Sequence, residues 1–202
     1  MKIAVIGAGS VGGNLGRAWV GAGHSVTFGV RNPDADGVVS LVGDLGGGAT
    51  AGSPAEAVAD GDVVVLAVPG TSIPEVVAPL AGDLVGKVVV NATNVMDPTA
   101  PSTNEAVRAA APEARVVRAF STLGAENFLA PVIGGVAADI LWCGPDEAAA
   151  VAEELIGCIG LRPVRVTSED AEAIIDAVFR LWVDLAMRQA RGRRLSINVV
   201  TD

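Results

Sequence analysis

The sequence has few aromatic residues and few of the side chains that usually donate protons in enzymes. It contains no tyrosine, one histidine and two cysteines, and its aromatic residues make up only 3% of 202. Basic residues are outnumbered, since 14 Lys and Arg face 23 Asp and Glu, which gives a formal net charge of −9. A nucleic-acid binder needs clustered cations, and a single-strand binder also needs aromatic platforms for the bases. We therefore expect no nucleic-acid partner.

Long apolar stretches and cysteine pairs are also missing. The apolar runs, such as residues 63–68, have the length of a strand and fall far short of the ~20 residues of a membrane span. No export signal is recognisable, since Met1 and Lys2 lead directly into a short apolar run. Cys143 and Cys158 have no second Cys or His near either, and we interpret them as buried free thiols in a reducing compartment. These features predict a cytoplasmic protein without a membrane partner.

Short β-branched runs alternate with longer alanine-rich segments of helical periodicity. This alternation is typical of a parallel sheet covered by helices on both faces. The prediction is an α/β fold with a doubly wound, mostly parallel sheet in residues 1–167, and a C-terminal helix and tail in residues 168–202 that pack on it. The expected strands are 2–6, 25–29, 62–67, 87–91, 115–120, 139–142 and 163–167, and the expected helices are 12–22, 34–45, 54–59, 73–80, 104–111, 147–159 and 169–192.

The last of these helices carries a wide apolar face that includes Phe179 and Trp182. This face has two uses that do not exclude each other: packing against its own domain, or pairing with a second subunit. Thr167 or Ser168 is the expected cap of the helix, ahead of an acidic pair. The tail at residues 193–200 alternates loosely, as a short edge strand would.

The strongest motif is Gly7-Ala8-Gly9-Ser10-Val11-Gly12, which follows the first strand and opens a helix. This context satisfies the dinucleotide-binding fingerprint. The first glycine permits a tight turn, the second lets the main chain approach a pyrophosphate, and the third lets helix and strand pack closely. The N-terminus of the helix then supplies unpaired N–H groups and a partial positive charge. We expect Gly7, Gly9, Ser10, Val11 and Gly12 to bind a dinucleotide.

The end of the second strand indicates which dinucleotide is bound. NAD-binding versions place an acid about 20 residues after the glycines, where it accepts hydrogen bonds from the ribose 2′-OH. Here that stretch reads Val30-Arg31-Asn32, and no acid appears before Asp34. An acid would repel a 2′-phosphate, whereas Arg31 can clamp one with its planar fork of donors. The sequence therefore predicts NADP(H), bound in part by Arg31 and Asn32.

Three further loops follow expected strands and should line the ligand crevice, because open α/β sheets bind ligands at the carboxyl ends of their strands. Their small polar side chains and amides suit ribose and carboxamide contacts, although turn chemistry alone would also select them. The cofactor-binding residues expected there are Val68, Pro69, Asn91, Ala92, Thr93, Phe120, Ser121 and Thr122.

Candidates for a catalytic proton donor are scarce. Reduction of an isolated ketone normally needs a positioned Lys, His or Tyr. The chain has only two lysines, both where strands are expected to begin, and His24 lies between the first helix and the second strand, on the far side from the crevice. We expect His24 to be structural, no catalytic side chain, and no metal site.

These motifs resemble the NADPH-dependent oxidoreductases of the deazaflavin coenzyme F420 and the related NADP-binding domains of metalloreductases. The resemblance covers most of the chain and implies that NADP(H) lies along the strand ends, with hydride passing directly to coenzyme F420 or a flavin. It also implies a homodimer. It departs from the family pattern at Val30, where the family often has Ser, and at Ser121, where it often has Asn. The motifs that carry it are the Gly7–Gly12 loop, Gly29-Val30-Arg31, Val68-Pro69, Asn91-Ala92-Thr93-Asn94, Ala119-Phe120-Ser121-Thr122 and the closing Gly192 segment.

Two other functions remain open from the residues alone. One is NADPH-dependent reduction of a small imine or keto acid at a site that a dimer partner completes near Phe179 and Trp182. The other is a non-enzymatic NADP-sensing module. Both share the nucleotide site with the F420 oxidoreductase interpretation. The first differs in its small-molecule substrate, and the second transfers no hydride to any acceptor.

Overall fold

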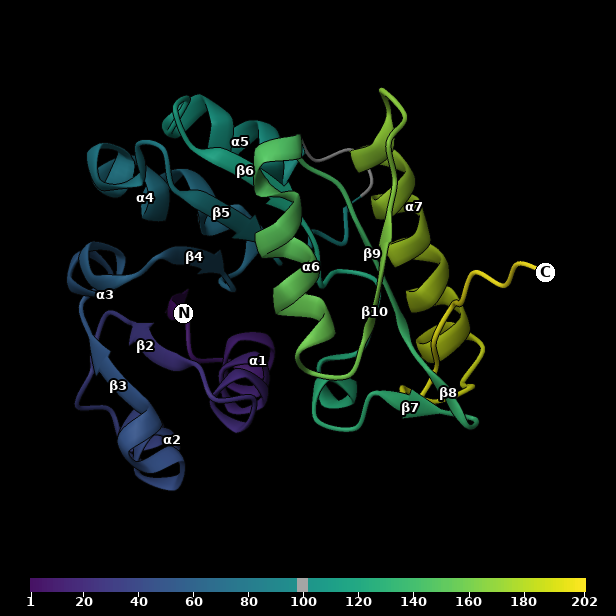
Figure 1. Ribbon diagram of the computed structural model, residues 1–202, viewed down its shortest axis with the longest axis horizontal. Coiled ribbons are helices and arrows are strands. Elements are labelled where there is room, and N and C mark those ends of the chain that lie inside the picture. The colour runs from purple at the N-terminus through teal and green to yellow at the C-terminus, as the bar shows by residue number, and fades with distance from the viewer. Residues whose placement is uncertain (98–101) are drawn as a thin grey trace.

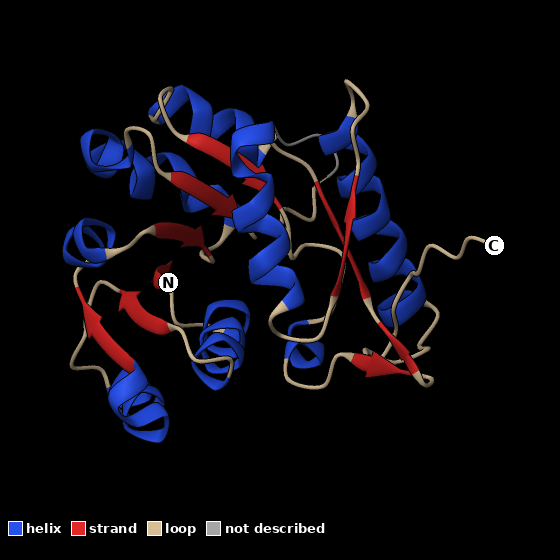
Figure 2. Ribbon diagram, in the orientation of Figure 1, coloured by secondary structure: helices blue, strands red, loops and turns tan. Residues whose placement is uncertain are grey.

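The computed structural model describes residues 1–97 and 102–202, and its centre is a six-stranded parallel sheet (Figures 1 and 2). The strand order is β3-β2-β1-β4-β5-β6. β2 and β3 therefore lie on one side of β1, and β4, β5 and β6 lie on the other side. This order confirms the predicted doubly wound sheet. The strands are β1 (Lys2–Ile6), β2 (Ser25–Gly29), β3 (Ala49–Gly52), β4 (Val63–Leu66), β5 (Val88–Asn91) and β6 (Arg115–Arg118).

Helices cover both faces of this sheet, which explains why its central strands are apolar on both sides. All four residues of β4, for example, are buried. The indole Nε1 of Trp19 donates to the carbonyl oxygen of Leu155 at 2.9 Å and so ties two helices of one face together. That face carries α1 (Ser10–Gly21), α2 (Asp36–Leu45) and α6 (Ala149–Gly157), and the other carries α3 (Pro54–Asp60), α4 (Ile73–Val77) and α5 (Thr103–Ala110).

A second, smaller layer extends the structure beyond β6. The strands β9 (Asp139–Trp142) and β10 (Arg162–Arg165) form a parallel pair. Cys143 exchanges two antiparallel backbone hydrogen bonds with Arg118, at 2.8 and 3.0 Å, which joins this pair to the end of β6. The helix α7 (Ala171–Val183) lies beside this pair (Figure 1). It packs on the pair through Ile175 and continues into a π-helical turn at Asp184–Arg188.

Several expected details of secondary structure are wrong. The short strand β3 was not expected, because its sequence Ala-Thr-Ala-Gly lacks a strong β pattern and only the neighbouring β2 gives it a partner. The hairpin of β7 (Val132–Ile133) and β8 (Val136–Ala137) was also missed. The tail at residues 193–200 forms no strand. The helix expected at residues 73–80 changes into a 3₁₀ helix at Ala78–Leu84, where Pro79 cannot supply an α-helical N–H.

Two further expectations about the C-terminal part are wrong. The last helix has Asp170 as its N-cap with no side-chain capping bond, so neither Thr167 nor Ser168 caps it. Cys143 is buried and free as expected, but Cys158 is exposed rather than buried. Within residues 1–97 and 102–202, no helix has the length and apolar character that crossing a membrane requires.

Candidate active site

The turn from β1 into α1 is so tight that only glycine fits at two of its positions. Gly7 has a φ of +106°, and a Cβ there would lie 2.6 Å from the carbonyl oxygen of Ala67. A Cβ on Gly12 would lie 2.0 Å from the carbonyl oxygen of Gly7. Gly9 differs, because a Cβ there would meet no atom within 4 Å. The space in front of Gly9 is therefore open to a ligand, as the approach of a phosphate requires.

The N-terminus of α1 faces the same space without a protein cap. Gly9 is the N-cap residue, it has no side chain to accept a hydrogen bond, and the first turn holds no acid. Gly9 and Ser10 are exposed, and Val11 is half-buried. The first N–H groups and the positive end of the helix dipole remain available to an anion. The five residues predicted from the fingerprint thus form one cradle.

The end of β2 lies beside this cradle. The N–H of Gly7 donates to the carbonyl oxygen of Gly29 at 3.0 Å, which fixes the two loops side by side. Arg31 is exposed, and in the described part of the chain its guanidinium forms no ion pair. The Oδ1 of Asn32 accepts the N–H of Asp34 at 3.2 Å, so that side chain shapes the turn. Arg31 is free to bind an anionic group.

The loops after β4 and β5 lie at the same edge of the sheet. The N–H of Ala67 donates to Ile6 at 2.9 Å, and the N–H of Ala92 donates to Leu66 at 3.0 Å, which continues the strand register into both loops. Val68 is half-buried, and its Cγ1 would lie 3.2 Å from a Cβ on Gly7. Pro69 is exposed, whereas Ala92 is buried. The structure brings the expected residues of these loops next to the glycine turn.

The side chain of Asn91 is fully engaged within the protein. Its Nδ2 donates to Thr103 Oγ1 at 2.9 Å and to Asn104 Oδ1 at 2.6 Å. Its Oδ1 accepts from the N–H and the hydroxyl of Thr93, at 3.1 and 2.6 Å. The amide has no donor or acceptor left for a carboxamide, and it holds the loop after β5 in shape.

The loop after β6 combines a packed ring with two unpartnered hydroxyls. Phe120 is buried with a φ of +58° and stacks edge-on against Trp19 and Phe128 at 5.6 and 5.8 Å. The hydroxyls of Ser121 and Thr122 are buried, and neither finds a hydrogen-bond partner among the described residues. A buried hydroxyl without a partner is costly, so these two suit a ligand that bonds to them.

The histidine and the two lysines lie at the opposite edge of the sheet. His24 precedes β2, and its Nδ1 lies 3.1 Å from the Met1 nitrogen. Lys2 pairs with Asp60 at 2.7 Å, and Lys87 donates to the carbonyl oxygen of Gly61 at 2.6 Å. Burial first, and then the nearby N-terminal charge, lowers the pKa of His24. These groups stabilise the amino edge, away from the glycine turn.

Comparison with known families decides what kind of protein carries this site. Residues 2–95, which include the glycine turn, Arg31 and the loops after β4 and β5, match the model of a family described as NADP oxidoreductase, coenzyme F420-dependent. The chain is an NADP-dependent oxidoreductase with a Rossmann-type fold. No curated protein sequence matches the chain significantly.

Solved structures extend the similarity to the whole chain. A protein of Arthrobacter sp. FB24, described as a candidate F420-dependent NADP-reductase, aligns over 100% of both chains with 25% identity and a TM-score of 0.86. A hypothetical protein of Sinorhizobium meliloti aligns over 100% of this chain and 96% of its own, with 27% identity and a TM-score of 0.76. An imine reductase of Aspergillus terreus shares the fold at 21% identity and a TM-score of 0.71, over 94% of this chain and 62% of its longer chain.

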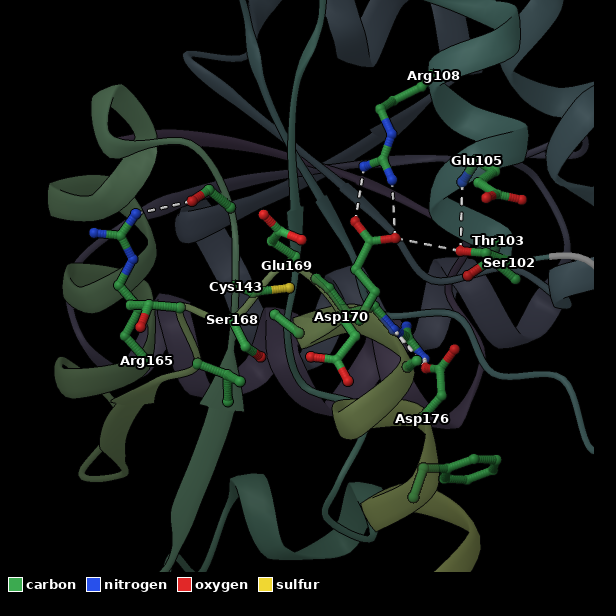
Figure 3. A pocket seen from close by; sticks show the side chains of 18 of the residues that line it. Ser102, Thr103, Glu105, Arg108, Cys143, Arg165, Ser168, Glu169, Asp170 and Asp176 are labelled. Atoms are coloured by element: carbon green, nitrogen blue, oxygen red, sulfur yellow. Dashed lines mark hydrogen bonds and ion pairs between the residues drawn. The ribbon is translucent and has the colours of Figure 1, made fainter.

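Beside the strand ends of this oxidoreductase lies a cavity that the sequence did not predict. Its volume is about 740 Å³, and it opens between α5, the end of β10 and α7 (Figure 3). Many of its lining side chains are charged, including Arg108, Arg118, Asp170 and Asp176. None of the expected cofactor residues lines it.

Glu172 on α7 is one of the acids that line this cavity. It accepts two hydrogen bonds from Arg108, at 2.8 and 2.9 Å, and one from Asn104 at 2.8 Å. Burial alone would raise the pKa of Glu172, but these bonds, the Arg108 charge and a weaker bond from Ser102 lower it below its usual value of 4.5. The ionised form is the one that joins α7 to α5.

We expect Glu172→Gln to lower the melting temperature at pH 7 by about 3–12 °C. Hydrogen bonds to a charged group contribute about 1.5–3 kcal/mol, and each 1 kcal/mol shifts the melting temperature of a chain this size by roughly 2–4 °C. A lowered pKa stabilises the fold above the unfolded value and loses this effect as the pH falls through the folded value. The difference between wild type and variant in thermal melts should therefore shrink below pH 4.5. A difference that stays constant down to pH 3 contradicts this assignment.

Proposed function

We propose that the chain transfers a hydride between NADP(H) and a deazaflavin, coenzyme F420, or a flavin-like acceptor that binds at the carboxyl edge of the sheet. Bound NADPH supplies the hydride. The chain's own residues bind the phosphates at the Gly7–Gly12 cradle and the 2′-phosphate at Arg31. Ser121 and Thr122 offer their unpartnered hydroxyls in the loop after β6. Catalysis then comes mainly from holding donor and acceptor in the reacting geometry.

The observation that carries this choice of acceptor is the position of every histidine and lysine. The sequence has no tyrosine. His24, Lys2 and Lys87 all lie at the amino edge, engaged with neighbouring groups. Reduction of a carbonyl substrate normally uses a Lys, His or Tyr at the reacting end to protonate the oxygen. A deazaflavin or flavin takes the hydride into its ring system without a dedicated side-chain acid, so it suits the groups available at this edge.

The experiment that tests the proposal is an absorbance assay with purified protein, NADPH and oxidised coenzyme F420, with NADH as the matched control. We expect NADPH-dependent loss of the deazaflavin absorbance and at least a 10-fold slower reaction with NADH. Reduction of a flavin instead of the deazaflavin would narrow the acceptor to the flavin class. If NADPH binds but neither ring system is reduced, while a small cyclic imine is, the imine reductase alternative replaces this proposal.

We further propose that the protein works in the reducing cytoplasm and pairs as a homodimer. The free thiols Cys143 and Cys158 support the first proposal, since an exposed thiol such as Cys158 persists in reducing surroundings. Leu181 on α7 is 47% exposed and supports the second. Phe179 and Trp182, expected at the dimer face, are buried within their own chain, so a dimer contact would use the exposed residues around them. Sedimentation of wild type and Leu181→Glu tests the dimer.

A further inference from the structure

Arg118, at the end of β6, is an arginine buried between the site loops and α7. Its side chain is only 3% exposed. Nη1 donates to the carbonyl oxygens of Asn91 and Thr93, and Nη2 donates to Asn94 Oδ1 at 2.9 Å. Nε and Nη2 donate to Asp176 Oδ1 at 3.1 and 2.8 Å. These bonds use all five N–H donors of a guanidinium.

The bonds of Arg118 connect three segments that line the site. The hydrogen bonds from Arg118 to the carbonyl oxygens of Asn91 and Thr93 hold the main chain of the loop after β5. The side chain of Asn91 also holds this loop, because its Oδ1 accepts from the N–H of Thr93. Asn94 extends the connection, since its Nδ2 donates to the carbonyl oxygen of Ser121 at 3.4 Å in the loop after β6. Asp176, at 28% exposure, anchors the same guanidinium to α7. One side chain thus holds both loops in a fixed relation to each other and to α7.

We propose that Arg118, held by Asp176, is the positioning residue that sets the geometry of the nicotinamide end of the site. The inference rests on the proposed function, in which the loops after β5 and β6 contact that end of the cofactor. Arg118 does not touch the reacting atoms, and it acts through Asn91, Thr93 and Asn94. Only a planar fork with five donors serves two carbonyl oxygens, an amide oxygen and a carboxylate at once, so lysine cannot replace it.

A second ion pair on the same helix provides a matched control. Arg108 binds Glu172, which lies one helical turn before Asp176 on α7. This pair also anchors α7, through α5, but Arg108 makes no hydrogen bond to the loops after β5 and β6 in the described structure. A variant without Arg108 therefore shows how a weaker attachment of α7 affects NADPH affinity and kcat when no hydrogen bond to the loops after β5 and β6 is removed directly.

The test compares wild type, Arg118→Lys and Arg108→Gln in two measurements. The first is the dissociation constant of NADPH beside that of adenosine 2′,5′-bisphosphate, which carries only the adenine end. The second is kcat and KM for deazaflavin reduction. We expect Arg118→Lys to weaken NADPH about 10-fold and to change the bisphosphate less than about 2-fold. We expect its kcat to fall about 10- to 100-fold, since a misplacement of about 1 Å can cost this much in rate. Arg108→Gln should match wild type in both measurements.

A double variant separates positioning from folding. Arg118→Met with Asp176→Leu replaces the ion pair by apolar side chains, so neither charge is left without its partner. The carbonyl oxygen of Thr93 and Asn94 Oδ1 lose their donor, so we expect a lower melting temperature than wild type. In the folded double variant, assayed well below its melting temperature, we expect a kcat as low as that of Arg118→Lys. Asp176→Asn keeps a neutral acceptor for the guanidinium and should lower kcat about 3-fold.

Three results would overturn the inference: wild-type kcat and NADPH affinity in Arg118→Lys, wild-type kcat in the folded double variant, or equal losses in Arg118→Lys and Arg108→Gln. The binding comparison needs no acceptor. If wild type reduces no deazaflavin, the proposed acceptor is wrong, and the selective loss of NADPH affinity in Arg118→Lys still decides the role of Arg118.

Discussion

Replacing Arg31 by glutamate is expected to weaken NADPH binding by about 100-fold and to leave NADH binding within about 3-fold of wild type. Charge-assisted hydrogen bonds to a phosphate are worth about 1.5–3 kcal/mol, and the new carboxylate adds repulsion of the 2′-phosphate. Arg31 is exposed and has no ion pair in the described part of the chain, so its loss should cost the fold little. Fluorescence titration of both reduced nucleotides measures the change.

The control for this variant is Arg115→Glu. Arg115 is also an exposed arginine, but it begins β6 and so lies at the amino edge of the sheet. The same change in net charge there should leave both nucleotide affinities within about 2-fold, since exposed charges far from a ligand are screened by salt. Equal losses of NADPH and NADH in Arg31→Glu would show that the arginine serves the fold rather than the 2′-phosphate.

The doubly wound sheet could be predicted from the sequence because each central strand carries its own signal. Continuous valine runs such as Val63–Leu66 are typical of strands buried on both faces, and they need no knowledge of their neighbours. β3 has no such signal, since its residues gain their role only by pairing with β2. The last helix shows the same limit at its start, where Ser168 looks like a cap and the structure begins the helix after Asp170.

The glycine turn between β1 and α1 was predictable for a similar reason. Gly7 and Gly12 are fixed by contacts within a few residues along the chain and with the adjacent strand, so the motif and its context contain the information. The hydrogen bonds of Arg118 could not be predicted, because its partners Asn91 and Asp176 lie 27 and 58 residues away in sequence. The one available signal was a charged residue at the end of an apolar strand, Val116-Val117-Arg118. A charge there is costly unless it is paired, which is a reason to look for partners.

Gly9→Ala should bind NADPH at least about 30-fold more weakly than wild type and melt within about 2 °C of it. Gly9 has φ −76° and ψ −163°, a conformation that alanine adopts without strain. The added Cβ would meet no atom of the protein within 4 Å. The folded protein therefore has no need of glycine here, and only a ligand that approaches the main chain would be displaced by the methyl group. Thermal melts and nucleotide titration on the same sample measure both effects.

Gly12→Ala, unlike Gly9→Ala, should destabilise the fold, with a melting temperature about 5–10 °C below wild type. Its Cβ would lie 2.0 Å from the carbonyl oxygen of Gly7 and 3.0 Å from Val5, so α1 must move away from β1. Overpacking of this kind costs about 1–3 kcal/mol, and each 1 kcal/mol lowers the melting temperature by roughly 2–4 °C.

Gly13→Ala is the matched control for both variants. A Cβ there would have its nearest contact at 3.5 Å, which is ordinary, so the melting temperature and the NADPH affinity should stay near wild type. If Gly9→Ala binds NADPH as tightly as Gly13→Ala does, no pyrophosphate lies against Gly9, and the dinucleotide must bind elsewhere along the strand ends.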